Sequence, residues 1–384
     1  MKISELVSPG ARSVRHRGWS VRHRGAVAAL AAAVLVGGPV ATGSLAGATP
    51  LSTTTTTCSL GLSAPDAAAT IGKNFFVANS TGNSVTEVNG STGACVNVFS
   101  GSTYGFHDPT AEVAMHGTLY VGNSNGASSS LTKFVPTTST ATILSGSAYG
   151  FDNPVGMAAT SSTVAVLNAN STVTVIRNGT PTIFSGATYH FNVPTSIAIS
   201  GNDLFVLNEG GGNITEINLA VAPATVTMLT SATYGFNFTV PSGTPVAPQL
   251  LVRSGDLWVT NPAASQVNEI KIATLAQIQK VVDSNLAMPG PVLSGGNYVY
   301  TTSPPGGSPM VSQVTASTGS VNWMMCNTND NYYFNNPQAG VVAGGHLWIV
   351  NEGGISAAGP STNTNGPSLT EMATGSGALV GYFT

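Results

Sequence analysis

The sequence predicts an all-β fold, a single β-propeller of seven four-stranded blades. Three features of the chain predict it: a hairpin pattern that recurs along the chain, an asparagine that closes the first run of each hairpin, and an aromatic phrase repeated between hairpins. The spacing of these features, near 45 residues, is typical of propeller blades.

Residues 1–48 have the pattern of an export signal. Six Lys or Arg residues precede position 25 against the single acid Glu5, an apolar run follows over Ala26–Val36, and small residues end at Ala48. This pattern predicts a Sec-type signal peptide over residues 1–48, and hence a secreted, extracellular protein. A membrane anchor is the alternative, but the apolar run is shorter than the roughly 20 residues that span a bilayer. We therefore expect no stable membrane insertion after cleavage.

Charge and composition limit what the remaining chain can bind. A threonine-rich linker over residues 49–62 leads into the predicted propeller domain, residues 63–384. Without the signal, 6 Lys and Arg (12 minus 6) face 14 Asp and Glu (15 minus 1), a net charge of −8. Because no basic tract remains, the composition argues against nucleic acid as a partner.

Seven segments read as β-hairpins in chain order. Each has an apolar run rich in aromatic and β-branched residues, a turn signal, and a second alternating run. These segments are Asn74–Val88, Thr118–Phe134, Thr163–Ile176, Asp203–Ile217, Asp256–Ile270, the degenerate copy Asn297–Val314, and His346–Met372.

An asparagine closes the first run of six hairpins and marks the period. The spacings are 44, 45, 40, 53 and 90 residues, and the last gap holds the degenerate copy. A further short apolar stretch lies before and after each hairpin, which gives four strands per unit. The asparagines are Asn79, Asn123, Asn168, Asn208, Asn261 and Asn351. A parallel β-helix would need shorter coils, and a helical solenoid would need a 3.6-residue period that is absent here.

A phrase of the form "SGxxYGFxxP" occupies the crossings between blades, as in "SGSTYGFHDP" at Ser100–Pro109. In a propeller these crossings and the hairpin turns share one face of the disc. Two readings of the aromatic residues stay open: they wedge between blades as packing, or they form a rim of platforms that binds sugars or apolar ligands. The residues are Tyr104, Phe106, Tyr149, Phe151, Tyr189, Phe191, Tyr234, Phe236, Tyr333 and Phe334.

One stretch breaks the β pattern. Leu275, Ile278, Val281 and Leu286 recur at helical spacing within Ile272–Met288. This spacing predicts a short surface helix at the outer side of the fifth blade.

The hairpin runs "LWVTNPAASQVNEI", "LYVGNSNG" and "LWIVNEGG" resemble NHL and YVTN-type propeller repeats, including the streptogramin lyase-like group. The resemblance covers the chain from about residue 65 onward and rests on short motifs. It implies a propeller, and for the lyases it implies metal-dependent chemistry at a histidine and acidic residues in the central funnel. No residues here match that catalytic pattern one for one.

Few residues offer catalytic chemistry. His107 and His190 lie in crossing phrases, and Glu209 and Glu352 occupy equivalent "NEGG" turns. These four residues could converge on the funnel and bind a divalent cation, calcium or magnesium, or supply a general base. The alternative is ordinary turn chemistry, with solvated glutamates and asparagines bonded to the backbone. His116 and His346 are expected to be structural.

Three cysteines leave at least one without an intrachain partner. Cys58 precedes the first blade and Cys95 begins its outer strand, so a Cys58–Cys95 disulfide would fasten the N-terminal tail to that blade. Cys326 is then the free thiol.

Two functions follow from these observations. The first is a secreted binding or interaction propeller that presents one face to a glycan, a cell-wall component or a protein. The second is a metal-dependent lyase or lactonase with its site in the funnel. The fold alone does not choose between them.

Overall fold

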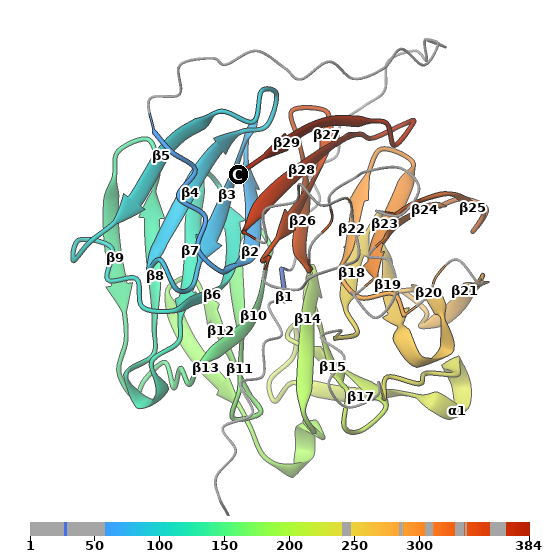
Figure 1. Ribbon diagram of the computed structural model, residues 1–384. Coiled ribbons are helices and arrows are strands. Elements are labelled where there is room, and N and C mark those ends of the chain that lie inside the picture. The colour runs from blue at the N-terminus through green and yellow to red at the C-terminus, as the bar shows by residue number, and fades with distance from the viewer. Residues whose placement is uncertain are drawn as a thin grey trace, which may run out of the picture.

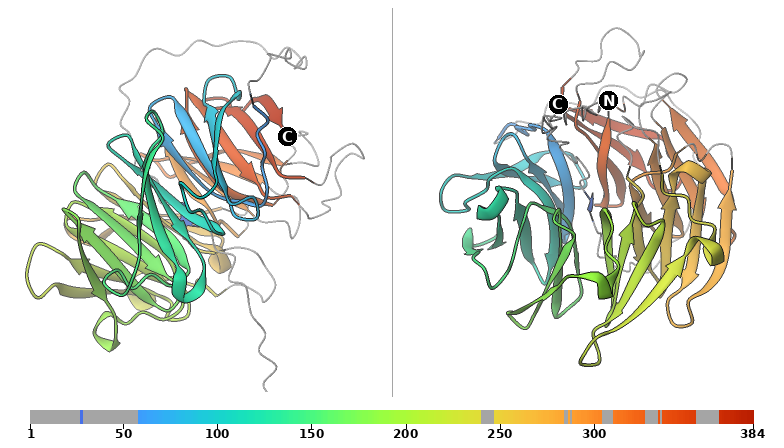
Figure 2. Two further views of the ribbon diagram at one scale, coloured as in Figure 1. Left: turned by 90° about the vertical axis from the view of Figure 1, so that its left-hand side faces the viewer. Right: turned by 90° about the horizontal axis from the view of Figure 1, so that it is seen from below.

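The computed structural model describes residues 27–28, 58–239, 247–283, 286, 288–303, 310–326, 334, 336–353 and 366–384. Seven antiparallel four-stranded sheets follow one another round a common centre, as the sequence predicts (Figure 1). The last blade lies beside the first, and its inner strand packs against that of blade 1 (Figure 2). No helix in the described ranges is both long and apolar enough to span a membrane.

Each blade contains four consecutive strands, numbered from the channel outward. Blade 1 consists of β2 (Pro65–Ile71), β3 (Asn74–Asn79), β4 (Ser84–Asn89) and β5 (Cys95–Ser100). Blade 2 consists of β6 (Pro109–Met115), β7 (Thr118–Asn123), β8 (Ser130–Val135) and β9 (Thr140–Leu144). Blade 3 consists of β10 (Pro154–Ala159), β11 (Thr163–Asn168), β12 (Thr172–Arg177) and β13 (Thr180–Phe184). Blade 4 consists of β14 (Pro194–Ser200), β15 (Asp203–Asn208), β16 (Asn213–Asn218) and β17 (Thr225–Thr230).

The remaining blades follow the same order. Blade 5 consists of β18 (Leu250–Arg253), β19 (Asp256–Asn261), β20 (Gln266–Lys271) and β21 (Ala276–Val282). Blade 6 consists of β22 (Val292–Gly295), β23 (Tyr298–Ser303), β24 (Met310–Thr315) and β25 (Val321–Cys326). Blade 7 consists of β26 (Pro337–Ala343), β27 (His346–Asn351), β28 (Ser368–Ala373) and β29 (Leu379–Phe383). Besides the blades, the described residues form one two-residue strand, β1 (Val27–Ala28), one short helix, α1 (Ser231–Tyr234), and three 3₁₀ turns.

The core lies between neighbouring blades. Between blades 1 and 2, for example, Phe76 and Phe99 pack with Leu119 and Phe134, and all four side chains are buried. Burying a side chain of this size contributes about 1.5 to 3 kcal/mol. Successive side chains of a strand point to opposite faces of the sheet, and apolar side chains lie on both faces here. A ring of packed sheets requires apolar side chains on both faces.

The repeated asparagine joins each hairpin to the crossing segment that precedes its blade. In blade 2, Asn123 accepts a hydrogen bond from the His107 backbone N–H at 3.3 Å and donates to Thr132 Oγ1 at 2.9 Å. Thr132 Oγ1 in turn donates to the carbonyl oxygen of Tyr104 at 2.7 Å. The asparagine and the threonine together therefore satisfy two backbone groups of the crossing segment.

The same link recurs in the crossings into blades 3 and 4, and in blade 5 Asn268 takes the place of the threonine. In blade 3, Asn168 accepts from the Asp152 N–H at 3.2 Å, and Thr174 donates to the Tyr149 carbonyl at 2.7 Å. In blade 4, Asn208 accepts from the Asn192 N–H, and Thr215 donates to the Tyr189 carbonyl. A buried amide left without such partners would cost about 1 to 3 kcal/mol, which accounts for the asparagine at this position.

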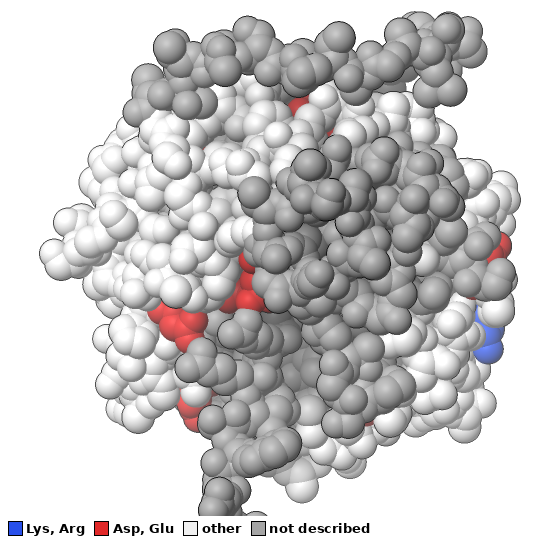
Figure 3. Space-filling view, viewed as in Figure 1, with Lys and Arg blue, Asp and Glu red and all other residues white. Residues whose placement is uncertain are grey.

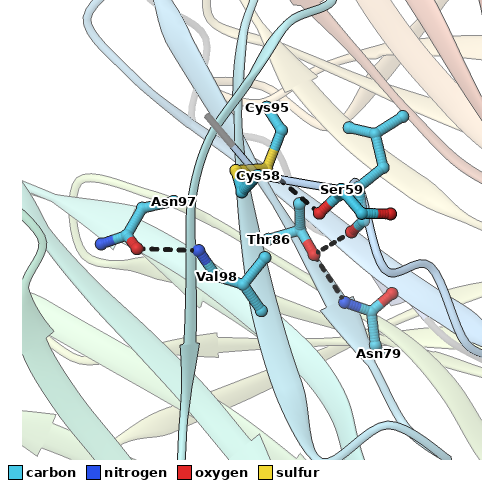
Figure 4. The surroundings of a disulfide bond; sticks show 8 residues. Cys58, Ser59, Asn79, Thr86, Cys95, Asn97 and Val98 are labelled. Carbon is cyan, nitrogen blue, oxygen red and sulfur yellow. Dashed lines mark hydrogen bonds between the residues drawn. A yellow bond between two sulfur atoms is a disulfide. The ribbon is translucent and has the colours of Figure 1, made fainter. Parts of the chain in front are cut away.

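At blade 1, the first blade among the described residues, the N-terminal tail takes the place of a crossing segment. Thr86 Oγ1 donates to the Leu60 carbonyl at 2.7 Å, and the Ser63 N–H donates to Asn79 Oδ1 at 3.2 Å. Leu60 thus takes the position that tyrosine holds in the other crossings, and it packs into the cluster shared by blades 7 and 1. Cys58 and Cys95 form a disulfide at the start of this tail (Figure 4).

The ring of blades is closed by side-chain contacts between blade 7 and blade 1, which do not share a sheet. All four strands of blade 7 come from the C-terminal part of the chain. Trp348 Nε1 donates to the Gly90 carbonyl of blade 1 at 3.1 Å, and its ring lies 5.0 Å from Phe75 and 5.5 Å from Phe383 between centroids. A Cβ on Gly90 would come within 2.5 Å of the Lys73 carbonyl oxygen, so glycine is required there.

The predicted helix over Ile272–Met288 is wrong. Ala276–Val282 form β21, the outer strand of blade 5, in antiparallel register with β20. Exposure alternates along this strand, with Val281 buried and Val282 exposed. Leu275 has a positive φ of 55°, which ends any helical continuity before the strand begins. Of the apolar residues that matched a helical period, Val281 lies on the inward side of this strand, Ile278 is exposed, and Leu275 and Leu286 lie outside the strand.

Substitution of the buried Asn168 tests the link between hairpin and crossing segment. Asn168→Ala removes the acceptor for the Asp152 N–H and the donor to Thr172 and Thr174. We expect it to lower the free energy of unfolding by about 2 to 3 kcal/mol, measured by urea denaturation. Asn170→Ala, two residues along the same turn, is the matched control: it removes an exposed acceptor for Thr172 but leaves the bond to the Asp152 N–H, and should change stability by less than about 1 kcal/mol. Equal effects of the two substitutions would contradict the role given to Asn168.

Loss of the disulfide tests the role of the tail. The bond closes a separation of 37 residues, so the double substitution Cys58→Ser with Cys95→Ser should lower stability by about 3 to 4 kcal/mol. Reduction of the unsubstituted protein should lower stability by a similar amount. Cys326→Ser is the control: this variant should keep its sensitivity to reductant, and a variant insensitive to reductant would show that another pairing matters.

Candidate functional site

The crossing segments and the hairpin turns lie together at one end of the propeller. The turn that follows each closing asparagine bonds to the crossing segment beside it: the Ser124 N–H donates to the Asp108 carbonyl at 3.1 Å, and the Glu209 N–H donates to the Val193 carbonyl at 3.1 Å. The Glu352 N–H likewise donates to the Asn336 carbonyl. This end of the disc, called here the crossing-loop face, is therefore shared by all these segments, as the sequence predicts.

The repeated aromatic residues pack between blades. Within each phrase the tyrosine stacks on the phenylalanine two residues later, with ring centroids 5.2 to 5.7 Å apart in the four phrases from Tyr104 to Phe236. Tyr104, Phe106, Phe151, Tyr234 and Phe236 are at most 9% exposed, and Phe334 is fully buried.

Part of three rings is accessible on this face. Tyr149, Tyr189 and Phe191 are half-buried. Tyr333 lies outside the described residues. Contact of these aromatic edges with a ligand stays a prediction, while their packing role is visible in the hydrophobic clusters.

Charge is divided between the two ends of the propeller. The crossing segments and the turns on the crossing-loop face contain no Lys or Arg. Lys73, Arg177, Arg253 and Lys271 lie at the ends of strands on the opposite side, whereas Lys280 of β21 reaches the crossing segment at Gly235. Figure 3 shows, among the atoms not drawn in grey, several acidic patches over one face and a basic patch at its right edge. The described carboxylates on or beside the crossing-loop face are Asp66, Asp108, Asp152, Glu209, Asp283 and Glu352.

The channel mouth is built from bulges at the start of the inner strands. The register shifts by one residue after the first proline of five of these strands, and the extra residues are Asp66, Thr110, Val155, Thr195 and Gln338. A bulge leaves its extra residue unpaired with the next strand and bends the chain.

Polar side chains at this mouth bind one another across turns and blades. Thr110 Oγ1 lies 2.8 Å from Ser124 Oγ and donates to the Pro154 carbonyl of blade 3 at 2.6 Å. In blade 7, Glu352 Oε2 accepts from Asn336 Nδ2 at 2.8 Å and from Gln338 Nε2 at 3.0 Å. These contacts fix the orientation of the turns at the mouth.

The four residues considered for catalysis share the face but belong to different blades. His107 is exposed, and its Nδ1 lies 3.1 Å from the Ser124 carbonyl oxygen. His190 is exposed in the crossing into blade 4 and has a φ of 54°. Glu209 belongs to blade 4 and Glu352 to blade 7. Among the described residues, no group of three His, Cys, Asp or Glu side chains is arranged to hold a metal ion.

The histidines expected to be structural lie at the opposite end. His116 lies in the turn between β6 and β7. His346 Nδ1 lies 2.9 Å from Glu371 Oε1 within blade 7. Burial raises the pKa of Glu371 to about 7 and lowers the pKa of His346. Their closeness makes them a local pair rather than part of the crossing-loop face.

Glu112 was not anticipated as a special residue. It lies in the inner strand β6 and is fully buried, and neither carboxylate oxygen has a hydrogen-bond partner among the described residues. Burial raises its pKa well above 4.5, and the nearby backbone amides of Ala69 and Ala78 offset part of this shift without reaching hydrogen-bond geometry. The signal in the sequence is a lone acid in "PTAEVAM", where the inner strand "PTSIAIS" of blade 4 has isoleucine.

Comparisons with known proteins support the fold. No protein-family model matches the chain, and no curated protein matches it. Among solved structures, the computationally designed Ika8 protein is similar, with a TM-score of 0.51 and 12% sequence identity over 74% of this chain and 80% of that chain. At this identity the likeness shows the fold alone. The chain is a seven-bladed β-propeller, and this fold supports a binding or interaction module in general.

The pH dependence of stability tests the burial of Glu112. Its pKa is raised on folding, so the folded state keeps a proton that the unfolded state releases above pH 4.5. The contribution of this group is therefore fully present below that value and is lost as pH rises toward the folded pKa, by up to about 1.4 kcal/mol per pH unit. Glu112→Gln cannot ionise and should lose less stability between about pH 5 and about pH 8 in urea denaturation.

The control for this measurement is Glu87→Gln in blade 1, which is half-buried and bonded to Asn74. This control keeps Glu112, so its stability should fall more steeply with rising pH than that of Glu112→Gln. An unchanged slope in Glu112→Gln would contradict the account of Glu112.

Proposed function

We propose that this protein is a secreted binding propeller that presents its crossing-loop face to an extracellular ligand, a glycan, a cell-wall component or a protein. The observation that carries the proposal is the gathering of crossing segments and turns from successive blades at one end of the channel, with six described carboxylates on or beside them and no Lys or Arg within these segments. Surface loops held by a rigid scaffold are where proteins of this kind bind their ligands.

Features of the sequence support the secreted part of this proposal. Residues 1–48 carry the basic start, apolar run and small residues of an export signal. A disulfide such as Cys58–Cys95 is typical of proteins that fold in oxidising compartments. The hairpin motifs support placing the chain near the NHL and YVTN-type propellers, with the streptogramin lyase-like group among them.

A metal-dependent lyase or lactonase is the second proposal. It is favoured by Glu352, whose carboxylate is held in place by Asn336 and Gln338 at the channel mouth. A held carboxylate there could bind calcium or magnesium together with a histidine. A thermal shift on adding either ion, lost in Glu352→Ala and kept in Asp203→Asn, would favour this second function.

Neutralising the carboxylates of the crossing-loop face tests the binding proposal. Arrays of glycans, cell-wall fragments and peptides are probed with the protein and with the double variant Asp108→Asn with Asp152→Asn. Because these side chains lie on the proposed face, we expect the binding that the protein shows to fall by about tenfold, a change of about 1.4 kcal/mol. The control is Asp203→Asn at the opposite end, which should bind as the unsubstituted protein does. Equal losses in both, or no loss in the double variant, would contradict the proposal.

A further inference from the structure

The channel offers unpaired strand edges. Each inner strand lies at the edge of its sheet, and only its outer side pairs with the next strand of the blade. An unpaired edge presents a row of backbone N–H and C=O groups that an added strand can satisfy. The one exception among the described strands is β10 of blade 3, because β1 pairs with it.

Strand β1 shows how an added strand lies in the channel. Val27 pairs with Gly156 and Ala28 pairs with Met157, in parallel register. Besides β10, β1 contacts the inner strands of four other blades, β2, β6, β14 and β26. It therefore lies inside the ring, as its position at the centre of Figure 1 also shows. An extended backbone can thus occupy the channel while it pairs with one blade.

The sequence of β10 explains why this edge takes the strand. The residue after the bulge is glycine in β10, Gly156, and it is alanine or serine in the other four bulged inner strands. A glycine lets another backbone approach more closely than any side chain would. The paired residue Val27 lies opposite this glycine.

Because β1 pairs in parallel with β10, the direction of β10 determines which end of a bound strand lies near the carboxylates of the crossing-loop face. β10 begins at Pro154, directly after a crossing segment, and runs away from the crossing-loop face. A strand parallel to β10 therefore has its N-terminal side toward that face, where six described carboxylates lie, while Lys280 of blade 5 reaches the same face beside Gly235. In the chain's own case, six Lys or Arg residues precede Val27 in the sequence. The charges of strand and mouth are complementary.

We infer that the channel is a peptide-binding site, in which an extended strand with a basic N-terminal half adds in parallel to β10. This inference rests on the proposed function and names its ligand class: a polypeptide segment, with Lys or Arg toward the crossing-loop face and small residues opposite Gly156 and Met157. The chain's own residues 27 and 28 are one occupant, and removal of residues 1–48 frees the edge for another.

Amide hydrogen exchange of the full chain, residues 1–384, tests this inference. In the unsubstituted protein the segment over β10 should exchange about tenfold more slowly than that over β14, the matched inner strand of the next blade. Ala28→Pro removes a backbone donor from β1 and should bring β10 to the rate of β14, while Ala28→Gly should not. Equal exchange of β10 and β14 in the unsubstituted protein, unchanged by Ala28→Pro, would overturn the inference.

A synthetic peptide tests the ligand class on the same protein. Residues 15–34, added in excess to the Ala28→Pro full chain, should restore slow exchange in β10. The reversed sequence, whose arginines lie at its C-terminal end, should not restore it, and neither should the peptide with Ala28→Pro. Restoration by the reversed peptide to the same extent would overturn the parallel, charge-directed mode.

Failure of these experiments is distinguishable from failure of the proposed function. If β10 shows no protection while Asp108→Asn with Asp152→Asn still weakens binding on the arrays about tenfold, the crossing-loop face binds its ligand without strand addition. If both fail, the binding proposal fails with the inference.

Discussion

The structure depends on one repeated hydrogen-bonded link between a hairpin and the crossing segment beside it. A buried asparagine at the end of the second strand binds the N–H of the crossing segment, and a threonine on the third strand binds its carbonyl, as Asn123 and Thr132 do for His107 and Tyr104. These bonds place the stacked tyrosine and phenylalanine of the phrase against the sheets on either side. The repeat of the asparagines and aromatic phrases in the sequence therefore corresponds to the repeat of this hydrogen-bonded link in the structure.

Blade 1 shows that the link matters more than the phrase. The tail supplies Leu60 and Ser63 in the positions of the tyrosine and the third residue after it. The Cys58–Cys95 disulfide holds this tail to blade 1. Together with Trp348 on Gly90, the tail joins the last blade to the first without a shared sheet.

The sequence predicted the features that repeat, and failed where a residue is unique. The hairpins and the asparagines predict the strand order, the number of blades and the shared face. They do so because a pattern repeated seven times stays recognisable when one copy is degenerate. The helix over Ile272–Met288 was wrong because the pairing of Ala276–Val282 with β20 decides for a strand, in which Ile278 and Val281 lie on opposite sides despite their helical spacing. Glu112 and the edge of β10 depend on packing around the channel, which no local pattern contains. The roles of His107, His190, Glu209 and Glu352 stay predictions.

The central claim is that the crossing segments are held as firmly as the strands, so that the crossing-loop face is a rigid surface. Amide exchange resolved by NMR at His107, Asp152 and Asn192, whose N–H groups bind the buried asparagines, tests it most directly. The account predicts exchange as slow as that of the buried strands, by about 10³ or more relative to the open turn at His116 and Gly117. Exchange at the rate of that turn would contradict it.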